Sequence, residues 1–208
     1  MLNLEVNKKY YTHVIAVGFL IIISCQNRTF DGEQELWRYL KDESNKYIQH
    51  KTVNGIDFSL LYKPTDILVQ QELENSQNKQ EIRKLREKYS QYMYLALSMS
   101  RNNQELLSTA PKNRNDFGAM VNQLAFGMSS KVHLYTQQKD TLELVDFVYP
   151  RMYGMTKTTD VLFVYPRNEK YLADKYIYFT IEDLGLNTGE VKFKIPIDKI
   201  NHEPKINF

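Results

Sequence analysis

Residues 92–100 read YMYLALSMS, and this stretch decides the fold of the chain. Side chains alternate between the two faces of a strand, and here both alternating sets are mostly apolar. A strand that is apolar on both faces is typical of the interior of a sheet that is covered on both sides. The stretch therefore predicts a central strand, for which the rest of the chain supplies the neighbours and the cover.

Further strands are predicted on both sides of this stretch. Upstream, the turn pair Asn54-Gly55 precedes residues 56–62, where apolar and mostly polar positions alternate as in a strand with one buried face. Downstream, similar runs recur at regular spacing with short turns at 138–140 and 186–189, which favours antiparallel pairing. The downstream strands are predicted at residues 132–137, 141–149, 161–165, 176–182 and 190–197.

Three segments show apolar residues at the steps of three and four that an amphipathic helix requires. The predicted helices cover residues 33–49, 66–89 and 115–128. Asp31 is the expected cap of the first helix, and Asn115 or Asp116 of the third. The third helix is expected to turn one face to the core: Phe117, Met120, Val121, Leu124, Ala125 and Met128. The predicted class is α+β, an antiparallel sheet from the C-terminal two thirds with about three packed helices.

Composition narrows the classes of function. The chain has 208 residues, 42% of them hydrophobic and 25% charged, as is typical of a globular protein. With 27 basic and 25 acidic side chains the formal net charge is +2, so no nucleic-acid partner is expected. His50, His133 and His202 are too far apart in sequence to form a metal-binding motif, and no catalytic or dinucleotide fingerprint is present. We therefore assign no catalytic, cofactor or metal residues from the sequence.

A short motif occurs twice, as VYPR at residues 148–151 and again at residues 164–167. In both copies a proline ends an apolar strand, because proline cannot donate a hydrogen bond to a neighbouring strand. Arg151 and Arg167 then follow just outside the sheet. If both lay at one rim, they could hold a carboxylate or phosphate, or contact a partner. The simpler interpretation is repeated strand-ending chemistry with two solvated arginines.

The amino-terminal region has the layout of an export signal. A polar stretch with Lys8 and Lys9 precedes an apolar run at residues 14–24, and Cys25, the only cysteine of the chain, follows directly. As a helix this run is roughly 16 Å long, whereas the core of a bilayer is about 30 Å thick. The run is therefore too short to form a stable transmembrane helix. With one cysteine, no internal disulfide is possible.

The junction Ile22-Ile23-Ser24-Cys25 resembles the lipobox of bacterial lipoproteins, in which an aliphatic and a small residue precede the cysteine. The resemblance covers about the first 25 residues. It implies that signal peptidase II removes residues 1–24 and that Cys25 carries acyl chains that bind the membrane. Residues 25–32 are then expected to be a polar tether and residues 33–208 a single globular domain. A plain secretory signal and a retained anchor are the alternatives.

The resemblance also implies a location. Asp directly after the cysteine tends to retain such lipoproteins at the inner membrane, and this chain has Gln26 there. An outer-membrane location is therefore favoured, on either the periplasmic or the surface face. We expect a lipid-anchored component that binds or scaffolds an envelope protein complex, with no cofactor. The alternatives are an envelope hydrolase with a site built from distant residues, and a lipoprotein that binds glycans or small ligands through exposed tyrosines.

Overall fold

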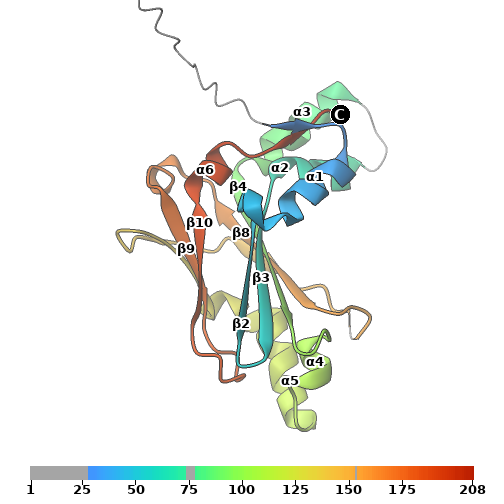
Figure 1. The fold of residues 1–208 in the computed structure, drawn as a ribbon, viewed down its shortest axis with the longest axis vertical. Helices are drawn as coiled ribbons and strands as arrows, with labels where there is room; N and C mark the ends of the chain where they lie inside the picture. The colour runs from blue at the N-terminus through green and yellow to red at the C-terminus, as the bar shows by residue number, and fades with distance from the viewer. Residues whose placement is uncertain (1–27, 74–77, 153) are drawn as a thin grey trace, which may run out of the picture.

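The computed structural model describes residues 28–73, 78–152 and 154–208. Two antiparallel sheets form the body of the protein, and helices lie at both of its ends (Figure 1). The predicted α+β class with antiparallel sheet is confirmed. The strands of this body, however, divide between two sheets, and the first of them begins at Ile48.

The larger sheet has five strands, and the stretch at residues 92–100 is its central one, as predicted. In order across the sheet the strands are β2 (Ile48–Val53), β3 (Ile56–Lys63), β4 (Tyr92–Ser100), β8 (Thr159–Pro166) and β7 (Asp146–Val148). All neighbours are antiparallel. Both faces of β4 are largely buried, which explains why its sequence is apolar throughout.

The smaller sheet has four strands and packs against the first. Its order is β10 (Val191–Pro196), β9 (Tyr176–Ile181), β5 (Val132–Thr136) and β6 (Thr141–Leu142). The core lies between the sheets, where the rings of Phe163 on β8 and Phe179 on β9 are 5.5 Å apart. At one edge the amide of Gln49 on β2 bonds the backbone of Lys194 on β10, which joins the two sheets.

Helices cover the two ends of this pair of sheets (Figure 1). At one end lie α1 (Glu33–Lys41), α2 (Thr65–Leu73), α3 (Lys79–Tyr89) and α6 (Ile197–Asn201). The short strands β1 (Thr29–Phe30) and β11 (Lys205–Ile206) pair there in parallel. At the other end lie α4 (Leu106–Thr109) and α5 (Arg114–Asn122). None of the helices in the described ranges is long and apolar enough to cross a membrane.

The folded part of the chain starts earlier than the predicted boundary at residue 33. Thr29 and Phe30 pair with Lys205 and Ile206, so this part of the predicted tether belongs to the fold. The predicted cap Asp31 is also wrong, since Gly32 occupies the N-cap position of α1 without a side-chain bond. The backbone of this segment pairs with the distant C-terminal segment. No local sequence pattern indicates such pairing, so the start of the fold could not be predicted from the sequence.

The first predicted helix is too long. It ends at Lys41, where Asp42 caps a short 3-10 turn, and residues 48–53 form β2. This strand lies at the edge of its sheet and alternates only weakly, which hides it from a periodicity argument. The Asn54-Gly55 turn forms the hairpin that pairs β2 with β3.

The second predicted helix is two helices, and residues 74–77 between them lie outside the described ranges. Asn78 caps α3 by accepting bonds from the backbone of Gln80 and Glu81. The two helices pack together and bury one small cluster: Val69, Leu73, Ile82 and Leu85. One continuous helix over residues 66–89 could not bring these four side chains together, so the prediction of a single helix is wrong.

The third predicted helix faces the core only at its C-terminal part. Asn113, not Asn115 or Asp116, caps α5, and the chain continues as a π-helical turn at Gln123–Gly127 and a 3-10 turn at Met128–Ser130. Of the predicted core face only Leu124 and Met128 are buried. Phe117 is 40% exposed. Met120, Val121 and Ala125 are half-buried, and Met120 and Val121 pack against the core. Because α5 lies at the end of the sheets and not over a face, its residues 114–119 stay exposed.

The predicted strand at residues 141–149 is divided between the sheets. Residues Thr141–Leu142 form β6 at an edge of the smaller sheet, and Asp146–Val148 form β7 at an edge of the larger one. The hairpin turn at 138–140 is confirmed, because β5 and β6 pair across it. The turn at 186–189 is also confirmed, as it lies in the connection of the paired strands β9 and β10.

The turn at Asn54-Gly55 gives a testable prediction. Gly55 has φ +71°, a conformation that side chains with a Cβ disfavour, and its surroundings are open. Gly55→Ala is therefore expected to lower the free energy of unfolding by about 1–2 kcal/mol through backbone strain alone. Gly118→Ala, inside α5 with open space and no positive φ, is the matched control and is expected to raise it by about 0.5–1 kcal/mol. Urea unfolding measures both, and equal changes in the two variants would contradict the prediction.

Candidate functional site

A groove of about 610 Å³ runs between α3 and the C-terminal segment. Its lining combines apolar groups with an unusual share of charged ones. The charged lining residues are Asp66, Lys79, Arg83, Arg86, Glu87, Arg167, Glu203 and Lys205. Arg167, one of the two arginines singled out from the repeated motif, thus lies in this groove.

The first charged pair in the groove joins two helices to the C-terminal strand. Arg86 on α3 binds both carboxylate oxygens of Asp66, with Nε to Oδ1 at 2.8 Å and Nη2 to Oδ2 at 2.6 Å. Asp66 is only 3% exposed and also accepts the backbone N–H of Ile206. The hydrogen bonds from Arg86 to this carboxylate raise the pKa of the guanidinium. Asp66 and Arg86 each bond the backbone of Ile206, and this pair therefore holds β11 in place.

The second pair holds the residues that follow α6. Glu203 is 8% exposed and accepts bonds from Arg167, from the hydroxyl of Tyr62 and from the backbone N–H of Thr65. Burial raises the pKa of Tyr62 well above its usual value, so its neutral hydroxyl donates. Burial works against the charge of Arg167, but Tyr62 and Glu203 outweigh it and raise the pKa of that guanidinium.

These contacts assign the groove a structural role. All four carboxylate oxygens of Asp66 and Glu203 already accept hydrogen bonds from within the fold. A general acid or base needs a free oxygen pointing at its substrate, and neither residue offers one. The two arginine–carboxylate pairs therefore fasten the C-terminal segment, and we do not place an active site there.

Arg151 lies at the opposite end of the protein from Arg167. Strands β7 and β8 are antiparallel, with Val148 beside Leu162, so the two VYPR motifs leave the sheet in opposite directions. At about 3.3 Å per residue, Arg167 lies roughly 16 Å beyond Leu162 on the other side. The alternative in which both arginines lie at one rim is therefore wrong. Neither is Arg167 a solvated arginine, because it is bound to Glu203.

Around Arg151 the surface is apolar. Its guanidinium lies over the exposed ring of Phe126, 5.5 Å from the ring centre, and makes no ion pair within the described residues. Among the described residues, the exposed large hydrophobic side chains come from two stretches, 117–126 and 145–155, which meet where Arg151 lies over Phe126, and we call them the apolar patch. Its members are Phe117, Phe126, Val145, Val148, Met152 and Met155. Phe126 is 70% exposed and Met155 82%.

Glu105 fixes the loop that carries Met152 and Met155. This carboxylate is 3% exposed and accepts the backbone N–H groups of Gly154 and Thr156. Burial alone would raise the pKa of Glu105, but the hydrogen bonds from Thr156 and Gly154 outweigh it and lower the pKa. A charged, buried carboxylate thus holds the loop while its methionines stay exposed.

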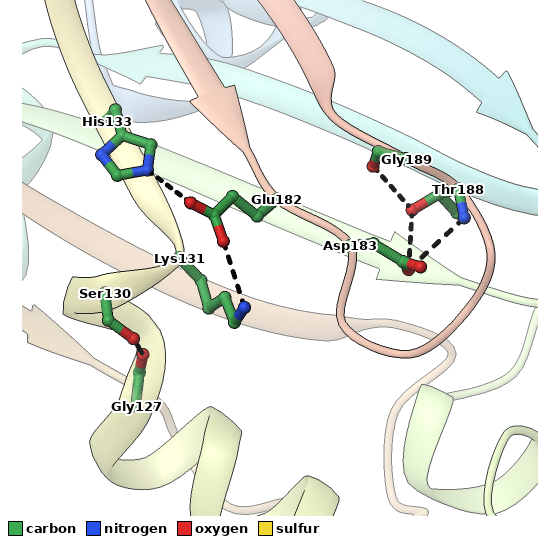
Figure 2. A network of polar contacts seen from close by, with 8 residues as sticks. All are labelled: Gly127, Ser130, Lys131, His133, Glu182, Asp183, Thr188 and Gly189. Atoms are coloured by element: carbon green, nitrogen blue, oxygen red, sulfur yellow. Dashed lines mark hydrogen bonds and ion pairs between the residues drawn. The ribbon is translucent and has the colours of Figure 1, made fainter.

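His133 lies on the outer surface of the smaller sheet (Figure 2). Its Nε2 is 3.0 Å from Oε1 of Glu182, and Lys131 binds the other oxygen at 3.1 Å. The hydrogen bonds from His133 and Lys131 lower the pKa of Glu182. Asp183 points elsewhere and accepts three backbone N–H groups of its own loop, as adjacent positions on extended chain predict. No group of three metal-binding side chains occurs within the described ranges.

Most of these residues carry no signal in the sequence that marks them as a site. Asp66, Arg86 and Glu203 lie far apart in the chain, and no spacing rule joins them. Phe126 and Met155 give a weak indication of a binding surface, since they are large apolar residues that do not belong to a regular alternating pattern. Cys25, the predicted lipidation site, lies outside the described residues, so its chemistry stays a prediction.

Comparison with known proteins does not assign the chain to a family. No family model and no curated protein match the chain. Among solved structures, the chain is similar to one described as a novel protein of unknown function from Burkholderia pseudomallei K96243. The TM-score is 0.41 at 11% identity, over 80% of this chain and 86% of that one. A likeness of this size says nothing about function.

Proposed function

We propose that this protein is a lipid-anchored component of the bacterial envelope, held in the outer membrane by Cys25, that docks an envelope protein on its apolar patch. The single observation that carries the docking role is the gathering of six large exposed hydrophobic residues on two neighbouring stretches. Soluble proteins rarely expose contiguous apolar surface of this kind unless it binds a partner.

The placement of the patch supports this proposal. The fold begins at Thr29 beside β11, only a few residues after Cys25, and α5 lies at the far end (Figure 1). The loop after β7 leaves the sheet at that same far end, because β7 runs towards the start of β8. An acyl chain on Cys25 would therefore hold the opposite end at the membrane and present Phe117, Phe126, Met152 and Met155 of the patch away from it, while Val145 and Val148 lie along β7.

Two cations lie beside the patch and bear on the kind of partner that would fit it. Arg151 and Lys157 are exposed and form no ion pair within the described residues. A partner with apolar anchors and carboxylates around them would satisfy both charges.

Photo-crosslinking from the patch tests the docking role. A photoreactive residue at Phe126 or Met155 is expected to yield one discrete crosslinked envelope protein, and the same residue at Lys84 on α3 is the control. The double variant Phe126→Ser/Met155→Ser should reduce recovery of that protein at least tenfold, since exposed anchors dominate binding. Its stability should change by less than about 0.5 kcal/mol, because neither side chain is in the core.

Two results would contradict the proposal. One is equal recovery of the crosslinked protein with the wild type and the double variant. The other is a product that consists of two copies of this chain, which light scattering on the purified protein would also reveal as a dimer.

A further inference from the structure

The outer face of the smaller sheet carries tyrosines and lysines and no carboxylate along its three long strands. Side chains at alternating positions of β5, β9 and β10 point away from the core, and those at the positions between them are buried. The positions on this outer side include His133, Thr180 and Pro196; we call its tyrosines and lysines, with one lysine of the adjoining turn, the Lys–Tyr face. Its members are Tyr135, Tyr176, Tyr178, Lys139, Lys192 and Lys194.

The strand register places these side chains in neighbouring rows. Tyr135, Tyr178 and Lys194 lie side by side across the three strands, and Lys192 lies in the next row beside Thr180. The rings of Tyr135 and Tyr178 are 5.7 Å apart. The face is therefore a continuous surface built on rigid strands.

Each lysine is held over a tyrosine ring. The Nζ of Lys192 lies 3.9 Å from the ring centre of Tyr178, and that of Lys194 lies 3.7 Å from Tyr176. Lys139 lies 4.6 Å from Tyr135. Attraction between ammonium groups and ring faces restricts these long side chains, so less freedom is lost when an anion binds.

The face offers hydrogen-bond donors, and the acidic residues nearest to it lie at its margins, among them Asp140 beside Lys139 and Asp174 near Tyr176. Within the described residues no carboxylate forms an ion pair with Lys139, Lys192 or Lys194, and the three tyrosine hydroxyls make no hydrogen bond. Glu182, the acidic residue just beyond the end of β9, is already bound by Lys131 and His133. Three fixed cations and three free hydroxyls thus form a surface complementary to a row of anions.

These observations select the chemistry of the ligand. A neutral sugar stacks on an open aromatic face, but here lysines cover the ring faces, and the tyrosines are half-buried. Lys192 and Lys194 are two residues apart on one strand, so their stems are separated by roughly 6.6 Å. Repeated anionic groups along an extended chain fit such spacing better than a single small anion. We propose that the Lys–Tyr face binds a linear anionic polysaccharide.

Binding of dextran sulfate to the full chain, purified in a non-ionic detergent, tests this site without any protein partner. Dextran of the same length is the uncharged control, and glycerol phosphate is a soluble stand-in for a lipid headgroup. Dextran sulfate should bind, and dextran and glycerol phosphate should bind at least tenfold more weakly. Binding should weaken as salt is raised, because it releases counterions from the polymer.

The variant Lys192→Gln/Lys194→Gln is expected to lose at least tenfold in affinity for dextran sulfate and to show a smaller salt dependence. Lys84→Gln/Lys112→Gln removes the same charge from exposed positions on α3 and before α5. It should bind dextran sulfate as the wild type does. Equal loss in the two variants would show that only overall charge matters and would overturn the proposal. Binding of glycerol phosphate as tight as that of the polymer would overturn it too. Neither result bears on the apolar patch.

Discussion

Glu203→Ala is expected to lower the free energy of unfolding by about 3–5 kcal/mol, because it removes one partner of a buried ion pair. The alanine leaves the largely buried guanidinium of Arg167 without a carboxylate, with side chains 22% and 10% exposed in the original pair. It also leaves the buried hydroxyl of Tyr62 and the backbone N–H of Thr65 without their acceptor. Urea unfolding followed by circular dichroism measures the change.

A matched control separates this effect from the loss of a carboxylate in general. Glu87 pairs with Arg83 on the exposed side of α3, with side chains 65% and 82% exposed. Glu87→Ala should change stability by less than about 0.5 kcal/mol, because exposed pairs contribute little. Glu203→Gln keeps an acceptor for Tyr62 and should fall between the two. If Glu203→Ala unfolds like Glu87→Ala, the C-terminal segment is not fastened by this pair.

Cys25→Ala is expected to abolish acylation of the protein and to release it from its acyl anchor. The chain has only one cysteine, so no other thiol can form the thioether. Burying acyl chains contributes about 0.8 kcal/mol per methylene, and two or three chains make a durable anchor. Growth with an alkyne fatty acid, followed by detection of the label on the protein, measures the outcome.

Two controls give this experiment a clear reading. Ser24→Ala keeps a small residue before the cysteine and should retain the label. The described fold begins after Cys25, so the purified Cys25→Ala protein should unfold at the same urea concentration as the wild type. Label that persists in Cys25→Ala, or an unlabelled wild type, would remove the basis for the lipid anchor.

Patterns in the sequence were most reliable where burial is local and periodic. The central strand at residues 92–100 and the predicted strands near 132, 161, 176 and 190 all form, because alternation along a strand directly reports which side faces the core. The pattern failed at β2, an edge strand with little apolar character, and it assigned too much of the third helix to the core, because Phe117 is exposed. An apolar stripe on a helix indicates that this face contacts other residues or a partner, but it does not indicate which residues or which partner.

Candidate sites were less accessible to sequence reasoning. The repeated VYPR motif drew attention to Arg151 and Arg167, and both lie at informative places, but antiparallel pairing of β7 and β8 carries them to opposite ends. Arg167 is enclosed by Tyr62 and Glu203, and Arg151 lies over Phe126. The two identical motifs therefore lie in different surroundings, because the residues that contact each arginine come from other segments of the chain.

The sequence by itself determined the α+β class, the central strand, most strand positions and the presence of one cysteine at a lipobox-like junction. These features depend on residues that are close together in the sequence, so they can be read from the sequence alone. Only the tertiary structure decided which strands share a sheet, which carboxylates meet which arginines, and where the apolar patch and the Lys–Tyr face lie. Those depend on contacts between residues that lie far apart in the sequence, from 20 positions for Asp66 and Arg86 to 141 for Tyr62 and Glu203, and these contacts form only when the sheets assemble.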